Sequence, residues 1–197
     1  MSDSAEFRSE GSLSADNDSL TLRISGVIDE SVVDGPGMRY VLFVQGCPHR
    51  CPGCHNPQTH DFEGGTLITV DDALAKIRAT LDNDPLIDGM TISGGEPMCQ
   101  AAALVPIAKE AKSRNLDLMI YSGYTYEQLR DMAKSDESIG YLLDNADKLV
   151  DGPFLMAERD LTLEFRGSRN QRYIDLVKTR KTGKVTPFVS DKWDIPL

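Results

Sequence analysis

The sequence has no excess of positive charge, no long hydrophobic run and few cysteines, and these shortages exclude whole classes of protein. With 21 Lys and Arg against 31 Asp and Glu, the net charge of −10 argues against non-specific nucleic-acid binding, which needs clustered cations. No apolar stretch approaches the roughly 20 residues that a helix needs to cross a bilayer. The first residues are acidic and polar, unlike a signal peptide. We therefore expect a cytoplasmic protein that binds neither nucleic acid nor membrane.

Three of the four cysteines lie within eight residues, and this cluster is the most informative feature of the chain. Cys47, Cys51 and Cys54 follow the apolar run 40–44 at Cys-x3-Cys-x2-Cys spacing. Clustered cysteines in a cytoplasmic protein indicate metal binding more than disulfides. A structural zinc site normally takes four protein ligands, whereas three thiolates suit a cluster with one iron left open. Zinc with Cys99 or a histidine as fourth ligand stays an alternative, although we expect Cys99 to be buried at a helix start.

Strands, loops and helices alternate along the middle of the chain. This pattern predicts strands over 39–45, 89–93, 116–121 and 148–150, and helices over 69–81, 100–113 and from Thr125 onwards. Such alternation indicates a parallel sheet whose functional loops gather at the carboxyl ends of its strands. The folded part, about 157 residues, is well short of the roughly 250 of a full eight-stranded barrel. We expect an α/β fold, an open partial (β/α) barrel with parallel strands.

The patterning predicts one domain between two tails. Residues 1–20 are rich in Ser, Asp and Glu and are expected to form a disordered tail. Residues 21–177 are expected to form the partial-barrel domain, which begins with an extended segment over 21–33. Residues 178–197 have weak hydrophobic patterning and are expected to form a C-terminal tail.

Two glycine-containing segments accompany the cysteines. Asp-Gly-Pro-Gly at 34–37 precedes the cysteine strand, and Ser-Gly-Gly-Glu-Pro at 93–97 follows the next strand. Together with the cysteine spacing, these segments resemble the radical S-adenosylmethionine superfamily, and more narrowly its glycyl-radical activating enzymes. The resemblance implies a 4Fe-4S cluster with three cysteine ligands, Cys47, Cys51 and Cys54. Its open iron would chelate the amino and carboxylate groups of S-adenosylmethionine.

Three further segments narrow the resemblance. Residues 122–124 (Ser-Gly-Tyr), 150–154 (Val-Asp-Gly-Pro-Phe) and 165–172 (Phe-Arg-Gly-Ser-Arg-Asn-Gln-Arg) are similar to the family that activates anaerobic ribonucleoside-triphosphate reductase. Gly53 replaces the aromatic residue that the superfamily usually has before the third cysteine, and that family tolerates glycine there. His55 matches the Cys-His-Asn of pyruvate formate-lyase activating enzymes, so this relative stays the alternative. A zinc-binding module or an iron-sulfur electron carrier is a more remote one.

The resemblance also implies a reaction and its cofactor contacts. One electron enters the cluster, S-adenosylmethionine is cleaved reductively into methionine and a 5′-deoxyadenosyl radical, and that radical abstracts hydrogen from a glycine of the reductase. Glycines allow close backbone approach, and a carboxylate suits a cationic amine. No side chain is expected to be catalytic beyond the cluster and the cofactor. The expected cofactor-binding residues are Gly53, His55, Gly94, Gly95, Glu96 and Ser122.

The implied partners are proteins. The large subunit of the anaerobic reductase would be the protein substrate, an external donor such as flavodoxin or ferredoxin would supply one electron, and a homodimer is allowed. Residues 166–184 carry seven Lys and Arg against one acid, Asp175. This stretch is either a solvated helix face or a basic region that helps an otherwise acidic protein to dock on an acidic partner.

Overall fold

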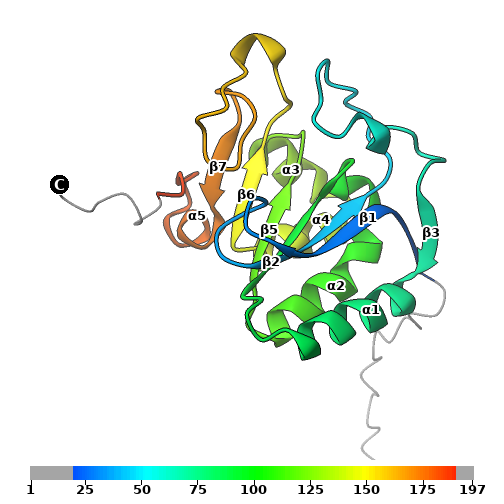
Figure 1. The fold of residues 1–197 in the computed structure, drawn as a ribbon. Coiled ribbons are helices and arrows are strands. Elements are labelled where there is room, and N and C mark those ends of the chain that lie inside the picture. Colours follow the sequence, from blue (N-terminus) through cyan, green and yellow to red (C-terminus); the bar gives the residue numbers. More distant parts are fainter. Residues whose placement is uncertain (1–19, 190–197) are drawn as a thin grey trace, which may run out of the picture.

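The computed structural model describes residues 20–189, which build one seven-stranded sheet in the order β3-β1-β2-β4-β5-β6-β7 (Figure 1). The four central strands run parallel. Antiparallel strands flank them on both sides, and the sheet does not close on itself. The expected open partial barrel is confirmed, with antiparallel edges added. The parallel strands are β2 (Arg39–Val44), β4 (Gly89–Gly94), β5 (Asp117–Tyr121) and β6 (Lys148–Asp151); the antiparallel ones are β1 (Thr21–Ser31), β3 (Thr66–Thr69) and β7 (Arg172–Asp175).

Helices cover one face of this sheet, and the main hydrophobic core lies beneath them (Figure 1). Apolar side chains of the two predicted helices are buried there, including Leu74 and Ile77 on α1 and Leu104 and Ile107 on α2. The helix predicted from Thr125 onwards is α3, and a capping box formed by Thr125 and Gln128 starts it. The helices are α1 (Val70–Asn83), α2 (Ala101–Ser113), α3 (Tyr126–Met132), α4 (Glu137–Asn145) and α5 (Leu176–Thr182).

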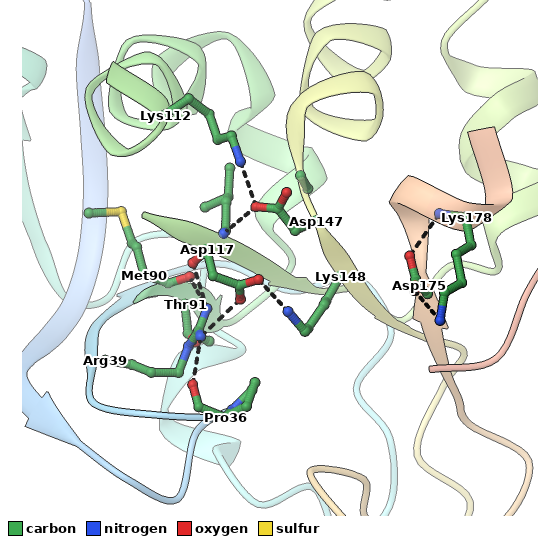
Figure 2. Close-up of polar contacts among 12 residues, drawn as sticks. Pro36, Arg39, Met90, Thr91, Lys112, Asp117, Asp147, Lys148, Asp175 and Lys178 are labelled. Atoms are coloured by element: carbon green, nitrogen blue, oxygen red, sulfur yellow. Dashed lines mark hydrogen bonds and ion pairs between the residues drawn. The ribbon is translucent and has the colours of Figure 1, made fainter. Parts of the chain in front are cut away.

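Arg39 lies on the opposite face of the sheet, at the amino end of β2. Because strand side chains alternate and Tyr40 and Leu42 lie in the helix-covered core, Arg39 lies on the other face. Its fully buried guanidinium donates five hydrogen bonds at 2.6–3.0 Å to four residues (Figure 2). Asp117, one of them, also pairs with Lys148. The acceptors are the Pro36 and Met90 carbonyls, the Thr91 hydroxyl, and the carboxylate and carbonyl of Asp117.

The structure adds elements that the sequence pattern did not predict. These are β3, β7, α4 and α5. The expected domain end at 177 falls inside α5, and a bridge between Ile174 and Pro187 ties the following residues to β7. The expected N-terminal tail lies, except for Leu20, outside the described residues, as does 190–197. Within the described range, no helix has the length and apolar character needed to span a membrane.

Candidate active site

The loops that follow the four parallel strands surround one cavity of about 420 Å³. This volume falls within the range typical of small-molecule sites. The cysteine loop (residues 45–56) and the β6–β7 segment (residues 152–171) rise at the same end of the sheet, at the top of Figure 1. Residues from both, together with Gly94 and Ser122 from the ends of the other two strands, line the cavity. The predicted gathering of loops at one sheet edge is confirmed.

Cys47, Cys51 and Cys54 all line this cavity and form no disulfide. Cys47 is buried, and the other two are half-buried. Burial raises the pKa of the Cys47 thiol, although hydrogen bonds from the backbone of His49 and Arg50 oppose that effect. A bound metal centre would favour the thiolate instead. No three His, Cys, Asp or Glu side chains in residues 20–189 are grouped as a site for one metal ion. The donor set suits an iron-sulfur cluster held by thiolates at the cavity wall.

Cys99 is separate from this group. It lies in the 3-10 turn η3 (Pro97–Gln100), it is exposed, and it does not line the cavity. The expectation of a buried thiol was therefore wrong. The preceding residue, Met98, occupies the buried position of this turn, so that Cys99 is turned outwards.

The glycine loop (residues 93–97) packs directly on the cysteine loop. The Gly95 amide donates to the Val44 carbonyl, and the Glu96 amide donates to the Gly46 carbonyl, both at 2.8 Å. A Cβ atom on Gly95 would lie 2.3 Å from the Gly46 oxygen, so no larger residue fits there. Gly94 has a φ of 100°, which favours glycine. Both glycines line the cavity, where their backbone is open to a ligand.

Glu96 is buried behind residues that line the cavity. Its side chain has an exposed fraction of 0 %, and it is not among the cavity-lining residues. A buried carboxylate needs hydrogen-bond donors, and here each oxygen has two. In this arrangement the hydrogen-bonding capacity of the carboxylate is taken up by groups of the protein itself. The donors are the Met98 amide and Ser122 hydroxyl on Oε1, both at 3.0 Å, and the Gly123 amide at 2.8 Å and His49 Nε2 at 3.0 Å on Oε2.

Gly53 lies against Met156 of the β6–β7 segment. It has a φ of 74°, and a Cβ atom there would lie 2.0 Å from the Met156 methyl group. Phe154, from the same segment, packs against the ring of His55 with 5.2 Å between ring centroids. His55 lines the cavity, whereas Gly53 does not. The left-handed backbone disfavours any residue other than glycine at 53, and the Met156 methyl group occupies the space that a side chain there would take.

Comparisons with known proteins agree with this site. Residues 33–174 match the family model of the 4Fe-4S single cluster domain. Anaerobic ribonucleoside-triphosphate reductase-activating protein of Vibrio cholerae is 37% identical over 144 residues, which are 71% of this chain and 89% of the relative. Its namesakes in Haemophilus influenzae and phage T4 are each 33% identical, over 71% of this chain and 89% and 85% of their own lengths.

The chain belongs to the family of anaerobic ribonucleoside-triphosphate reductase-activating proteins. It also resembles the pyruvate formate-lyase-activating enzyme of Clostridium pasteurianum, with 37% identity over 122 residues, which are 59% of this chain and 50% of that protein. The family is thus one of activating enzymes with a 4Fe-4S domain.

In this member of the reductase-activating family, the β6–β7 segment also supplies cavity residues that sequence reasoning did not assign. Arg166 lines the cavity and donates from Nη1 to the Gln171 carbonyl at 3.3 Å, while its buried Nε has no partner among the described residues. Asp34 and Tyr121 also line the cavity, and the Tyr121 hydroxyl donates to the Phe165 carbonyl at 2.9 Å. The signal for Arg166 was its place in the segment that carried the family resemblance.

The basic stretch 166–184 is not a free charged face. Arg172 pairs with Asp151 and Glu127, and its hydrogen bonds lower the pKa of the Glu127 carboxyl. Arg180 donates to the Leu143 and Ala146 carbonyls at the end of α4. These cations hold elements of the fold together, so reversing the charge of Arg172 would not isolate an effect on docking.

Proposed function

We propose that this protein activates an anaerobic ribonucleoside-triphosphate reductase by generating a glycyl radical on its large subunit, as a cytoplasmic radical S-adenosylmethionine enzyme. The observation that carries the proposal is the meeting of the three cysteines and the glycine loop at one cavity. The names of the relatives support the protein substrate. An external one-electron donor such as flavodoxin or ferredoxin completes the reaction.

In this proposal, Cys47, Cys51 and Cys54 hold a 4Fe-4S cluster and leave one iron for S-adenosylmethionine. When both are bound and the cluster is reduced, the cluster and S-adenosylmethionine together would supply cleavage of a carbon–sulfur bond and removal of one hydrogen atom from a glycine. The chain's own part is to bind, orient and exclude water. The exposed backbone of Gly94 and Gly95 is placed to bind the methionine end of the cofactor.

The walls of the cavity suit the rest of the cofactor and the substrate. His55 and Phe154 form an aromatic pair that can pack against the adenine. Arg166 offers an unpaired Nε in the cavity wall, where it can donate to a polar group of the cofactor. Ile28 and Val33 line the cavity and are exposed, so they form an apolar edge by which a peptide can enter.

Reconstitution tests the chemistry. The protein is loaded anaerobically with iron and sulfide, reduced, and mixed with S-adenosylmethionine, and 5′-deoxyadenosine is measured. We expect Cys47→Ala, Cys51→Ala and Cys54→Ala each to abolish product, because each removes a cluster ligand. Cys99→Ala is the matched control and should keep full activity, because Cys99 is exposed outside the cavity. A reduced cluster that yields no product would overturn the proposal.

The second candidate is activation of pyruvate formate-lyase. The similarity to the Clostridium pasteurianum enzyme and His55 after the third cysteine favour it. The glycyl-radical signal separates the two: we expect it on the reductase and not on pyruvate formate-lyase when each is offered alone. A zinc module or a simple electron carrier would give neither this signal nor cleavage of the cofactor.

A further inference from the structure

His49 is the one residue of the cysteine loop whose side chain binds the buried carboxylate of Glu96. It lies two positions after Cys47 and two before Cys51, with 17 % of its side chain exposed. Its Nε2 lies 3.0 Å from Oε2 of Glu96. The rings of His49 and Tyr124 pack edge to face, with 4.5 Å between their centroids. The histidine is therefore held on two sides.

Gly123 holds the ring on a third side. A Cβ atom at Gly123 would lie 2.4 Å from Cδ2 of His49, closer than real Cβ contacts come. The φ of Gly123 is not in the left-handed region, so its backbone alone would accept alanine. Glycine is needed at 123 because the His49 ring occupies the space of a side chain.

Glu96 connects this ring to the other loops of the site. Its hydrogen bonds reach the cysteine loop through His49, the turn after β5 through Ser122 and Gly123, and η3 through Met98. Because the carboxylate is buried, each donor is held in place by the need to satisfy it. Of these links, only the one to His49 joins the carboxylate to the loop that bears the cysteines.

We propose that His49 is a positioning residue that locks the cysteine loop, through Glu96, onto the two loops that bind the cofactor. The proposal rests on the proposed function. The lock fixes the distance between the three thiolates and the backbone of Gly94 and Gly95, so that a ligand can reach the open iron and the glycine loop at once. Groups behind the ligands of a metal commonly set geometry in this way.

The first test compares His49→Ala with His49→Gln. We expect His49→Ala to take up the same iron but to bind S-adenosylmethionine roughly 10- to 100-fold more weakly, and to lose the change that the cofactor causes in the electron paramagnetic resonance spectrum of the reduced cluster. His49→Gln keeps an N–H donor near the Nε2 position and should recover most of the affinity. Equal affinity of His49→Ala and wild type would overturn the proposal.

A second readout needs no cluster. In the apo protein, the amides of Gly123 and Met98 both donate to Glu96. Hydrogen exchange of these amides should be faster in His49→Ala than in wild type and restored in His49→Gln. Unchanged exchange at both amides would contradict the lock.

Gly123→Ala tests the lock without touching its hydrogen-bonding groups. It should displace the ring and weaken cofactor binding as much as His49→Ala, and the double variant should be no weaker than His49→Ala alone. Gly140→Ala is the matched control, because a Cβ atom there meets nothing closer than 3.7 Å. Additive losses would overturn the proposal. Failure of the wild-type protein to bind S-adenosylmethionine would instead sink the proposed function itself.

Discussion

Arg39 and Glu96 are buried charges of opposite sign at opposite ends of the parallel strands. Arg39 begins β2, and Glu96 follows β4 by two residues. Both have exposed fractions of 0 %, and both are surrounded by hydrogen-bond partners from several segments. The same physical need, to satisfy a charge removed from water, thus organises both ends of the sheet.

The partners of the two charges differ in kind. Arg39 bonds to strand carbonyls and to Asp117, which itself pairs with Lys148, and it is not among the residues that line the candidate active site. Glu96 bonds to loop amides and to Ser122 and His49, both of which line the cavity. Arg39 therefore stabilises the sheet, whereas Glu96 fixes the geometry of the site.

The largest effect is expected at the amino end. Arg39→Met would leave the partly exposed Asp117 paired with Lys148 and would leave the Pro36, Met90 and Asp117 carbonyls without the donors that Arg39 supplies, at a cost of about 3–5 kcal/mol in the free energy of unfolding. Urea unfolding of the apo protein measures this loss. Arg78→Met is the control: Arg78 is half exposed and its partner Glu110 keeps Arg114, so a loss below about 1 kcal/mol is expected. Equal losses in the two variants would show that the buried Arg39 contributes no more to stability than an exposed ion pair.

An intermediate effect is expected beside the cysteines. Gly53→Ala would force alanine into a left-handed backbone, at about 1–2 kcal/mol, and would also press on Met156. Thermal unfolding should show this loss. Adding Met156→Ala should recover the part due to overlap and leave the part due to backbone strain. Full recovery in the double variant would show that the φ of 74° is relaxed at no cost.

The smallest effect concerns a partly exposed carboxylate, that of Asp160, which sharpens the contrast with the two fully buried charges. Hydrogen bonds from the Thr162 hydroxyl and amide, and then from Arg169, lower the pKa of Asp160 from 3.8 to about 2. A lowered pKa means that the contribution of Asp160 to stability is present above about pH 4 and is lost as the pH falls through 2. Carboxyl NMR titration should show the midpoint near 2, and Thr162→Val should raise it. A wild-type midpoint near 3.8 would contradict the hydrogen bonds at this turn.

The sequence pattern predicted the elements that carry strong apolar runs. All four parallel strands and the helices α1, α2 and α3 were found where expected. The unpredicted β7 has four residues, two of them charged, and is defined by pairing with β6 rather than by its own pattern. The unpredicted α4 has its apolar residues, Ile139, Leu142 and Leu143, in a single short stretch.

Some features of the candidate site could likewise be predicted from the sequence, and others could not. The three cysteines and the two glycines could be brought together from the sequence, because loops after parallel strands meet at one edge. The direction of Glu96 could not, since an acid after a strand reads the same whether it faces a ligand or the interior. Its direction depends on Ser122 and His49, which come from other loops. Likewise, Gly53 is explained by its positive φ and by Met156 in a distant segment, and neither can be read from the residues around it.

The contacts of Gly95 and Glu96 with the backbone of Val44 and Gly46 continue the pairing of β2 and β4 beyond the strands. The site therefore has no hinge of its own at this point. The base of the cysteine loop, at Gly46, cannot separate from the glycine loop unless the parallel ladder opens from its end, which is a rarer event than the fluctuation of a free loop. Beyond this ladder, the link from the cysteine loop to Glu96 is made by the side chain of His49. The backbone of the sheet thus fixes where the loop begins, and side-chain contacts fix the course of the part that bears the cysteines.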